Sequence, residues 1–377
     1  MNTGKSICHV TSAHPAEDGR IFRRACIAAA EAGYTTYLVE QGESYDKQGV
    51  HIIGTGYPKK KGRLYRMTIF TRKVFKAALD TNADIYQLHD PELLPYAIRL
   101  KKRGKAVIFD SHEDYVEQIR SKPYLPNYIA EIASRVYGIY SRFVFSHIDG
   151  LTYPGTAGVP STFDHLCKRV VPTDNLPWLY ELYDRYIVKG KEANTACYIG
   201  ILAEERGVTQ VVKACHKAKC KLYLAGRFSS AEYKKRIESL PEYENVEYMG
   251  VLDREAIASL LNNVSVGVCT LLNVGQYYKM SNLPTKVYEY MSMAVPVIVN
   301  DSYFNKMMVD KYHFGECVDP QNISQFSKVL RSLLNDPELQ KMYGNNGRKA
   351  IKDNLCWDKE KKNLIEMYES ILNNNKY

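Results

Sequence analysis

Short runs of apolar residues alternate along the chain with longer segments in which apolar residues recur every three or four positions. The short runs are rich in β-branched and aromatic residues, which predicts buried strands, and the longer spacing predicts amphipathic helices. Strands that alternate with helices are typical of parallel sheets with crossover helices. The pattern therefore predicts an α/β protein.

The predicted strands fall into two series separated by a proline-rich stretch at residues 172–178. A chain of 377 residues is too long for one ordinary core, so each series predicts a doubly wound, Rossmann-like domain. A helix over 19–32, capped by Gly33, follows the first strand. The expected strands are 6–11, 34–40, 84–88, 106–110 and 150–153, then 197–200, 222–225, 246–249, 264–269 and 295–299. The expected organisation is a domain over 1–174, a hinge over 175–194, a domain over 195–357 and a terminal helix over 358–377.

The terminal helix has one apolar stripe, which must be buried against another part of the protein. We expect it to pack near the hinge, returning toward the N-terminal domain. The stripe consists of Leu364, Met367, Tyr368, Ile371 and Leu372.

Composition is that of a water-soluble globular protein, with 45% hydrophobic and 25% charged residues. We expect a cytoplasmic protein, because the first residues lack the apolar core of a signal peptide and no run approaches a membrane span. Nine scattered cysteines without a Cys-x-x-Cys pair indicate reduced, buried thiols.

Basic residues outnumber acidic ones by 51 to 42, a net charge of +9 that suits nucleic acid, anionic lipid or a phosphate-bearing substrate. Part of the excess lies in residues 59–76, which contain no acidic residue. We expect the apolar side of this segment to pack on the sheet and its basic side to attract an anionic membrane or a lipid-diphosphate acceptor. The basic residues are Lys59, Lys60, Lys61, Arg63, Arg66, Arg72, Lys73 and Lys76, and the apolar ones are Leu64, Met67, Phe70, Val74 and Ala77.

The strongest candidate for chemistry is the loop and helix start within residues 281–296. Pro284 suits a helix start, with Ser281 and Asn282 available as caps, and free backbone N–H groups there suit a diphosphate. Lys286 would add a positive charge, and Glu289 could accept hydrogen bonds from ribose hydroxyls. The alternative is a solvent-exposed Lys286–Glu289 pair on an ordinary helix.

Three further groups of polar residues follow strands of the N-terminal domain, where ligands of parallel sheets bind. They could orient a sugar or assist proton transfer from an acceptor. The alternative is helix capping by Asp18, Asp90 or His112, with Glu113 favouring a helix N-terminus. The groups are His14, Asp18 and Arg20, then His89 and Asp90, then Asp110, His112 and Glu113.

The segment Lys286-Val-Tyr-Glu-Tyr-Met-x-x-x-x-Pro-Val297 resembles the signature of glycosyltransferase family 4, which has the GT-B fold of two Rossmann-like domains facing across a cleft. His14-Pro-x-x-Asp18-x-Arg20, Leu88-His-Asp90 and Asp110-Ser-His-Glu113 resemble one branch of that family. The resemblance implies retaining transfer from a nucleotide-diphosphate sugar. It also implies a donor site made by Gly200, Arg206, Arg227, Gly250, Val251, Ser281, Asn282, Leu283, Pro284, Thr285, Lys286 and Glu289.

The sequence departs from the family pattern at four places, one of which is Arg206, where a lysine is expected. Ser281 stands where a first glutamate is common, Ile201 stands where an arginine is common, and residues 14–19 replace a glycine-rich loop. Neutralisation of the diphosphate must then depend on Arg206, Lys286 and Arg227.

The expected function is a metal-independent glycosyltransferase without a cofactor, because no Asp-x-Asp triplet is available to hold a nucleotide-bound metal. Family frequency favours a UDP-sugar donor, and a lipid-linked saccharide of surface polysaccharide synthesis is the expected acceptor. The catalytic candidates are Asp110, His112, Glu113, Arg206 and Lys286, and the acceptor-binding candidates are His14, Asp18, Arg20, His89 and Asp90.

Two rival functions are a nucleotide-sugar epimerase of the same fold and a non-catalytic basic module that binds a membrane or nucleic acid. No zinc-finger spacing, RNA-binding motif or helix-turn-helix signal supports nucleic-acid binding.

Overall fold

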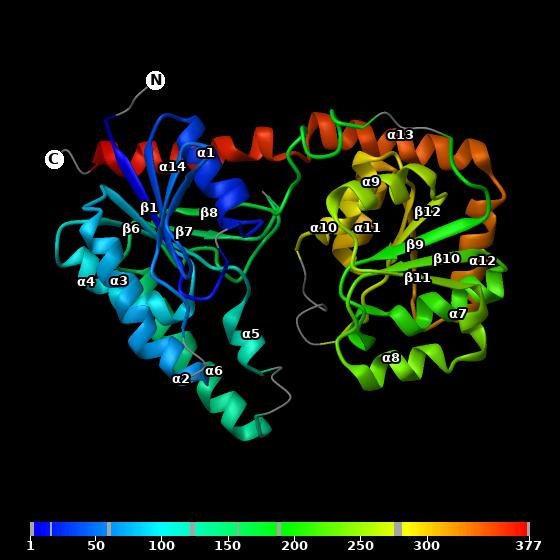
Figure 1. Ribbon diagram of the computed structural model, residues 1–377, viewed down its shortest axis with the longest axis horizontal. Coiled ribbons are helices and arrows are strands. Elements are labelled where there is room, and N and C mark those ends of the chain that lie inside the picture. The colour runs from blue at the N-terminus through cyan, green and yellow to red at the C-terminus, as the bar shows by residue number, and fades with distance from the viewer. Residues whose placement is uncertain are drawn as a thin grey trace. The chain divides into compact units, whose positions relative to one another are not determined.

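A computed structural model describes residues 4–15, 17–58, 62–120, 125–156, 158–186, 190–274 and 281–374. The chain forms two compact units, of which Figure 1 shows the first in blue to green with the red C-terminal segment, and the second in green to orange. Unit 1 comprises Met1–Asn175 and Glu360–Tyr377, and unit 2 comprises Leu176–Lys359.

Unit 1 is built on an eight-stranded sheet in the order β3-β4-β2-β1-β5-β6-β7-β8, in which β3 alone pairs antiparallel. The central strands are buried on both faces, which explains why they are continuous apolar runs rather than alternating ones. The strands are β1 (Ser6–Val10), β2 (Thr35–Glu40), β3 (Tyr45–Lys47), β4 (Val50–Gly54), β5 (Ile85–Leu88), β6 (Ala106–Asp110), β7 (Gly150–Tyr153) and β8 (Val170–Pro172).

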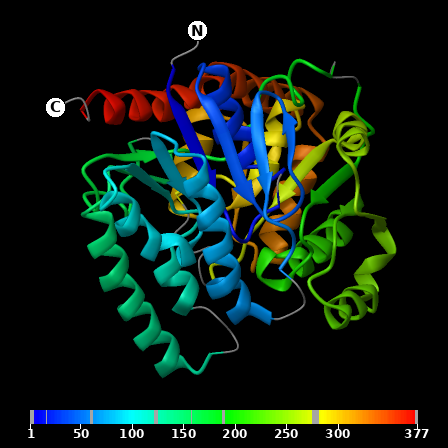
Figure 2. The ribbon, with the colours of Figure 1, turned by 60° about the vertical axis from the view of Figure 1, so that its left-hand side comes forward.

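Helices cover both faces of this sheet. Helices α3, α4 and α6 share one apolar core with β1, β5, β6 and β7, and Figure 2 shows these helices together. The helical elements are η1 (Ile21–Cys26), α1 (Ile27–Glu31), α2 (Gly62–Tyr65), η2 (Arg66–Phe70), α3 (Thr71–Asp80), η3 (Pro91–Leu93), α4 (Leu94–Lys101), α5 (Tyr115–Arg120) and α6 (Asn127–Phe145).

The C-terminal helix α14 (Trp357–Asn374) contributes its residues from Glu360 onward to unit 1. The Tyr368 hydroxyl donates to Gln87 of β5, and the side chain of Met367 packs beside Gly150 of β7. Leu364, Met367, Tyr368 and Ile371 are buried, as the apolar stripe predicted, and Leu372 is partly buried.

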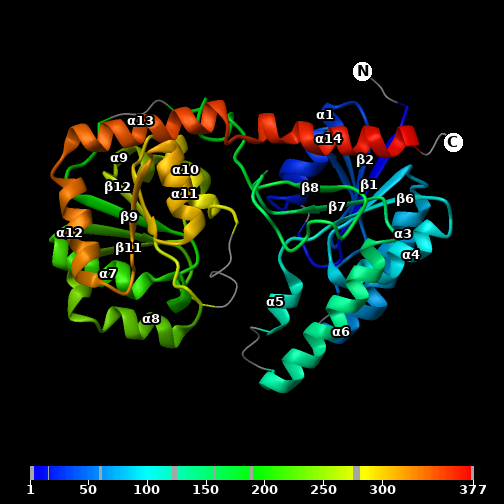
Figure 3. The same cartoon turned by 180° about the vertical axis from the view of Figure 1, so that it is seen from behind.

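Unit 2 contains a six-stranded parallel sheet in the order β11-β10-β9-β12-β13-β14. Figure 3 shows its helices α9, α10, α11 and α13. The strands are β9 (Thr195–Ile199), β10 (Lys221–Ala225), β11 (Val246–Gly250), β12 (Val266–Cys269), β13 (Val297–Asn300) and β14 (Gly315–Val318). The helices are η4 (Glu204–Arg206), α7 (Val208–Ala218), α8 (Ala231–Glu238), η5 (Pro241–Asn245), α9 (Arg254–Asn263), α10 (Thr285–Ser292), α11 (Tyr303–Tyr312), α12 (Ile323–Leu334) and α13 (Pro337–Asp353).

The predicted class of two Rossmann-like domains with parallel sheets is confirmed. Each predicted strand is present with small shifts at its ends, and the first predicted helix begins as the π-helical turn η1. The sequence interpretation missed β3, β4, β8 and β14. These strands lie at or near sheet edges, where partial exposure removes the continuous apolar signal.

The expected packing of the basic segment is correct for its second half only. Phe70 and Val74 are buried in the unit 1 core, whereas Leu64 is 77% exposed and Met67 is also exposed. Lys59, Lys60 and Lys61 lie outside the described residues. Among the helices of the described part of the chain, none has the length and apolar character of a membrane span.

Candidate functional site

In unit 2, three loops that follow strands approach one another so closely that only glycine fits. A Cβ on Gly226 would lie 1.7 Å from the carbonyl oxygen of Gly200, and a Cβ on Gly207 would lie 2.0 Å from that of Thr270. Gly200, Gly207 and Gly226 all have positive φ, which side chains disfavour. Backbone segments therefore pack directly against one another at the carboxyl ends of β9, β10 and β12, where parallel sheets bind ligands.

The ammonium group of Lys286 lies at this junction. Its Nζ is 3.6 Å from the centroid of the Tyr198 ring and 3.0 Å from where a Cβ on Gly200 would be. Lys286 is buried, and its Nζ has no hydrogen-bond partner among the described residues. Burial lowers the pKa of Lys286 to about 8, and the nearby charge of Arg206 acts in the same direction. A buried cation without a polar partner is costly, so this position is prepared for an anion.

Helix α10, which carries Lys286, begins differently from the prediction. Pro284 is the N-cap residue and provides no side-chain cap, so the expected caps Ser281 and Asn282 do not occupy that position. Proline at the N-cap has no N–H to satisfy, and the first amides of the helix remain directed toward its N-terminal end. Leu283 is buried beneath this start, and Thr285 is exposed.

The alternative of an exposed Lys286–Glu289 pair is wrong, because both side chains are largely buried and Glu289 pairs elsewhere. The Glu289 carboxylate accepts a hydrogen bond from Arg254 at the start of α9. Arg254 also lies 3.9 Å from Glu181. Glu289 is thus held in place one helical turn beyond Lys286.

The remaining predicted donor residues surround the same strand ends. Arg206 is partly buried, and its charge acts on both Lys286 and the thiol of Cys269. Gly250 accepts a hydrogen bond from the Gly226 amide at 2.6 Å. Arg227 and Val251 are exposed beside these loops.

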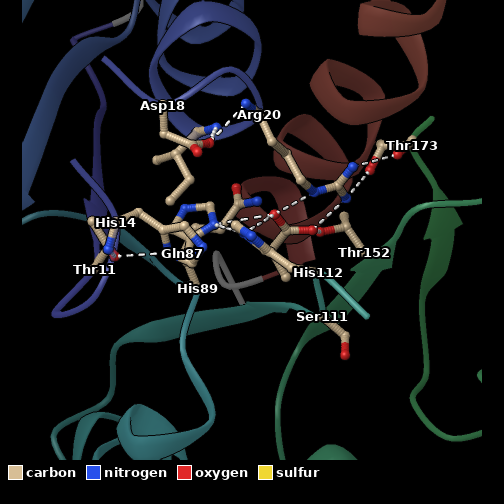
Figure 4. A network of polar contacts seen from close by, with 12 residues as sticks. Thr11, His14, Asp18, Arg20, Gln87, His89, Ser111, His112, Thr152 and Thr173 are labelled. Atoms are coloured by element: carbon tan, nitrogen blue, oxygen red, sulfur yellow. Dashed lines mark hydrogen bonds and ion pairs between the residues drawn. The ribbon is translucent and has the colours of Figure 1, made fainter. Parts of the chain in front are cut away.

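Unit 1 contains a buried polar network centred on Asp110, at the end of β6 (Figure 4). Arg20 binds its carboxylate with two hydrogen bonds, Nε to Oδ2 at 2.9 Å and Nη2 to Oδ1 at 2.6 Å. The Thr152 hydroxyl donates to Oδ1 at 2.7 Å, and Arg20 also donates to the carbonyl oxygen and hydroxyl of Thr173. Burial would raise the pKa of Asp110, but Arg20 and the neighbouring histidines hold it well below its usual range.

Two histidines complete this network. Asp110 Oδ2 lies 3.1 Å from His89 Nδ1 and 3.2 Å from His112 Nε2, and the two nitrogens are 3.3 Å apart. His9 Nδ1 lies 3.1 Å from His89 Nε2. The consistent tautomers have His89 and His112 donating to Asp110 while His9 donates to His89, which leaves His9 Nε2 as a buried acceptor without a partner in the described chain.

Two imidazoles and a carboxylate at these distances are also a donor set for a transition metal. Here the guanidinium of Arg20 already neutralises the same carboxylate. A second cation would lie beside that positive charge, so we interpret the cluster as a hydrogen-bonded network.

Asp90, after β5, organises the loop that follows β1. Its Oδ2 accepts from the Thr11 hydroxyl at 2.9 Å and from the backbone amides of Ser12 and Ala13, and its Oδ1 lies 3.0 Å from His14 Nδ1. In a dinucleotide-binding domain, amides of this loop would face a phosphate. A carboxylate of the protein occupies that position in unit 1, so the Ser12 and Ala13 amides already have an acceptor.

Of the three polar residues of unit 1 that the sequence offered as helix caps, only one has that role. Asp18 accepts from the amides of Arg20 and Ile21, so it does cap η1. The cap of α5 is Asp114 rather than His112, since Asp114 accepts from the amides of Val116 and Glu117. Asp90 occupies the N-cap position of η3 without a side-chain cap bond.

The predicted site residues of unit 1 therefore form two groups, one buried and one accessible to solvent. Arg20, His89, Asp90 and Asp110 are buried and fully engaged, so their geometry makes them positioning residues. His14 and His112 lie at the accessible edge of the network, with their ring centroids 4.5 Å apart and their planes tilted by 41°. Glu113 is partly buried and accepts from Gln118.

Sequence reasoning missed residues that support both sites. Their only local signal was a position at a strand end or helix start, because the partners lie far away in the sequence. They are His9, Thr11, Thr152 and Thr173 in unit 1, and Tyr198, Arg254 and Thr270 in unit 2.

The histidines should titrate in opposite directions. Burial lowers the pKa of His9 well below 6.5, whereas the hydrogen bond and charge of Asp90 outweigh burial and raise the pKa of His14. His14 then stabilises the fold below pH 6.5 and loses that contribution as pH rises through its folded pKa, while neutral His9 costs stability as pH falls below 6.5. NMR titration should show His14 protonating first and His9 unchanged between about pH 7.5 and 5.5. The reverse order would contradict the network.

Comparison with solved structures places both units in the GT-B fold of glycosyltransferases. A sucrose-phosphate synthase of Thermosynechococcus elongatus matches with a TM-score of 0.77 at 15% identity, over 98% of this chain and 99% of the other. The protein Alr3699/HepE of Anabaena, solved with UDP and glucose, matches with a TM-score of 0.67 at 11% identity, over 97% of this chain and 100% of the other.

Comparison with protein families identifies one domain of the chain. Residues 181–350 match the family model of glycosyl transferases group 1, so the chain contains a domain of that group within unit 2. An uncharacterized glycosyltransferase of Methanocaldococcus jannaschii is 20% identical over 192 residues. That match covers 49% of this chain and 47% of the relative, about half of each.

Proposed function

We propose that the protein transfers a sugar, with retention at the anomeric carbon, from a nucleotide-diphosphate sugar to a hydroxyl of an acceptor, as in glycosyltransferase family 4. The buried, unpartnered ammonium of Lys286 at the glycine-lined junction supports this most directly. A diphosphate would satisfy that cation, and the start of α10, where Pro284 provides no side-chain cap, would contribute backbone N–H groups.

The chemistry that these residues support is stabilisation of a leaving group. As the bond between the anomeric carbon and the diphosphate oxygen breaks, negative charge grows on the phosphates, and Lys286 and Arg206 would stabilise it. The leaving phosphate would take the acceptor's proton on the face from which the acceptor attacks. Such transfer needs no nucleophile from the protein.

We propose that the histidines of unit 1 serve the sugar and the acceptor. His14 and His112 are the accessible members of the network and can hydrogen-bond to hydroxyl groups. Arg20, His89 and Asp110 fix the orientation and tautomer of His112 rather than contacting substrate.

We propose a UDP-sugar as donor and a lipid-linked saccharide as acceptor. The Anabaena protein of the same fold was solved with UDP and glucose, and this supports a UDP-sugar as the donor. Glu289, fixed by Arg254, lies one turn beyond Lys286 and suits the ribose hydroxyls of a nucleotide whose phosphates contact Lys286.

Thermal unfolding with a panel of nucleotide sugars tests this function. A specific UDP-sugar should raise the melting temperature, because a ligand that binds only the folded state stabilises it. Glu289→Ala should weaken nucleotide affinity by roughly tenfold, since two hydrogen bonds to hydroxyls are lost, and should leave the fold intact. The matched control is Glu238→Ala, which removes a glutamate of a surface pair with Lys234. Equal affinity of both variants would refute the ribose role. Turnover of donor alone, without acceptor, would indicate an epimerase.

We propose that transfer is independent of metal ions, because Lys286 and the nearby charge of Arg206 would neutralise the phosphates in place of a nucleotide-bound cation. Activity should be unchanged by a chelator. Loss of activity that manganese restores would overturn this proposal.

A further inference from the structure

Helix α6 exposes an unusually apolar outer face. Seven large side chains along it are between 38% and 74% exposed, and at 100° per residue all fall within an arc of about 120°. Monomeric proteins rarely expose a contiguous apolar patch of this kind without a binding role. The seven residues, called here the α6 face, are Tyr128, Ile129, Ile132, Val136, Ile139, Tyr140 and Phe143.

The opposite side of α6 is already used. Ala130, Val144 and Phe145 are buried, and Val144 and Phe145 belong to the unit 1 core, so the helix is anchored with its apolar face outward. Its 19 residues span about 28 Å. Charged residues within it, among them Arg135 and Arg142, fit a helix that lies along a surface rather than across a membrane.

Three arginines lie beside the α6 face, and acidic residues pair with two of them. Glu131 is paired with both Arg120 and Arg135, whereas Arg142 forms no ion pair with any described residue. Arg120, Arg135 and Arg142 also line a pocket of about 390 Å³ between α5 and α6, together with Asp114 and Glu117. Ile139 belongs to the α6 face and also lines the pocket, so the pocket and the apolar face are continuous.

A second exposed apolar patch lies in α2 and η2 of the same unit, where Leu64, Met67 and Ile69 are exposed. Exposed basic residues Arg72 and Lys76 follow in α3, and no acidic residue occurs in this segment. In Figures 1 and 2 the α2–α3 segment and α6 extend toward the same end of unit 1.

We propose that the α6 face rests on an anionic lipid surface, with Arg142 and the basic residues of α3 contacting lipid headgroups. Apolar and aromatic side chains bordered by unpaired basic residues have the chemistry of an interfacial helix. A second copy of the chain fits less well, because it would bring the same uncompensated positive charges together. This docking rests on the proposed function, since a lipid-linked acceptor lies at a membrane. Binding to the lipid surface can nevertheless be measured without sugar transfer.

Vesicle flotation with the full chain tests the proposal without donor or acceptor, so its failure is distinct from failure of transfer. The chain should bind phosphatidylcholine vesicles containing about 30% phosphatidylglycerol, and high salt should weaken binding. Ile132→Ser with Ile139→Ser should weaken binding at least about tenfold, because two exposed apolar side chains no longer enter the lipid. The same double substitution should preserve the circular dichroism spectrum.

Tyr303→Ser is the matched control, since Tyr303 is an 86% exposed aromatic residue of unit 2. It should leave vesicle binding unchanged. Arg142→Glu should weaken binding to anionic vesicles more than to neutral ones. Absence of binding to anionic vesicles would overturn the proposal. A dimer in light scattering that the double substitution dissociates would assign the α6 face to a second copy and would also overturn it.

Discussion

Replacing Lys286 with methionine should reduce sugar transfer by about 100- to 1000-fold while the free energy of unfolding stays equal or rises. The loss is expected because an ammonium group placed where phosphate charge develops stabilises the transition state directly. The gain in stability is expected because Lys286 Nζ has no hydrogen-bond partner in the described chain and is buried. Removing an uncompensated buried charge relieves a cost of folding. Steady-state kinetics and denaturant unfolding measure the two effects.

The pH dependence of stability provides a second test of whether the Lys286 ammonium is buried without a partner. Its folded pKa of about 8 lies below the ordinary value of 10.5, so the unfolded chain binds more protons between these values. Stability of the unliganded protein should therefore gain a rising contribution from pH 8 to 10.5, and Lys286→Met should remove it. A bound diphosphate should also reduce it, because an anion favours the charged lysine.

Lys234→Met is the control for this experiment. Lys234 Nζ also lies over an aromatic ring, 5.3 Å from the centroid of Tyr248, but forms a surface ion pair with Glu238. This variant should retain activity, and its stability should still rise between pH 8 and 10.5. Full activity in Lys286→Met would refute the proposed phosphate site, and a large loss of its stability would give Lys286 a structural role instead.

Replacing Asp110 with alanine should destabilise unit 1 by about 3–5 kcal/mol, since it leaves a buried guanidinium without its counter-charge. Arg20 would lose two hydrogen bonds to the carboxylate, and His89 and His112 would lose their common acceptor. Hydrogen exchange in β6 and β7 is a suitable measurement, because both tryptophans belong to unit 2 and report on that unit.

Asp46→Ala supplies the comparison, because Asp46 pairs with His51 on the exposed side of unit 1. That change should cost less than about 0.5 kcal/mol. Equal effects of the two substitutions would show that the network around Asp110 contributes no more than a surface pair.

The sequence predicted the order of strands and helices well, but it did not predict whether the site residues are buried. The alternation of strands and helices placed Asp110, His89 and Lys286 after strands or at a helix start, where the structure has them. It did not reveal whether each side chain is exposed. Lys286 and Glu289 have a spacing that suits a surface pair as well as a binding site, and only burial and the position of Arg254 separate the two.

The sequence by itself determined the two-domain α/β class, the central strands and the strand ends that carry the polar residues, because periodicity and helix starts are local properties of the chain. The tertiary structure alone decided which residues meet. Arg20 and Asp110 are 90 positions apart, and Thr11 and Asp90 are 79 apart, so no local pattern could pair them. It also decided that Lys286 is buried without a partner and that the α6 face is uncovered. Both depend on what packs nearby, and packing is set by distant segments.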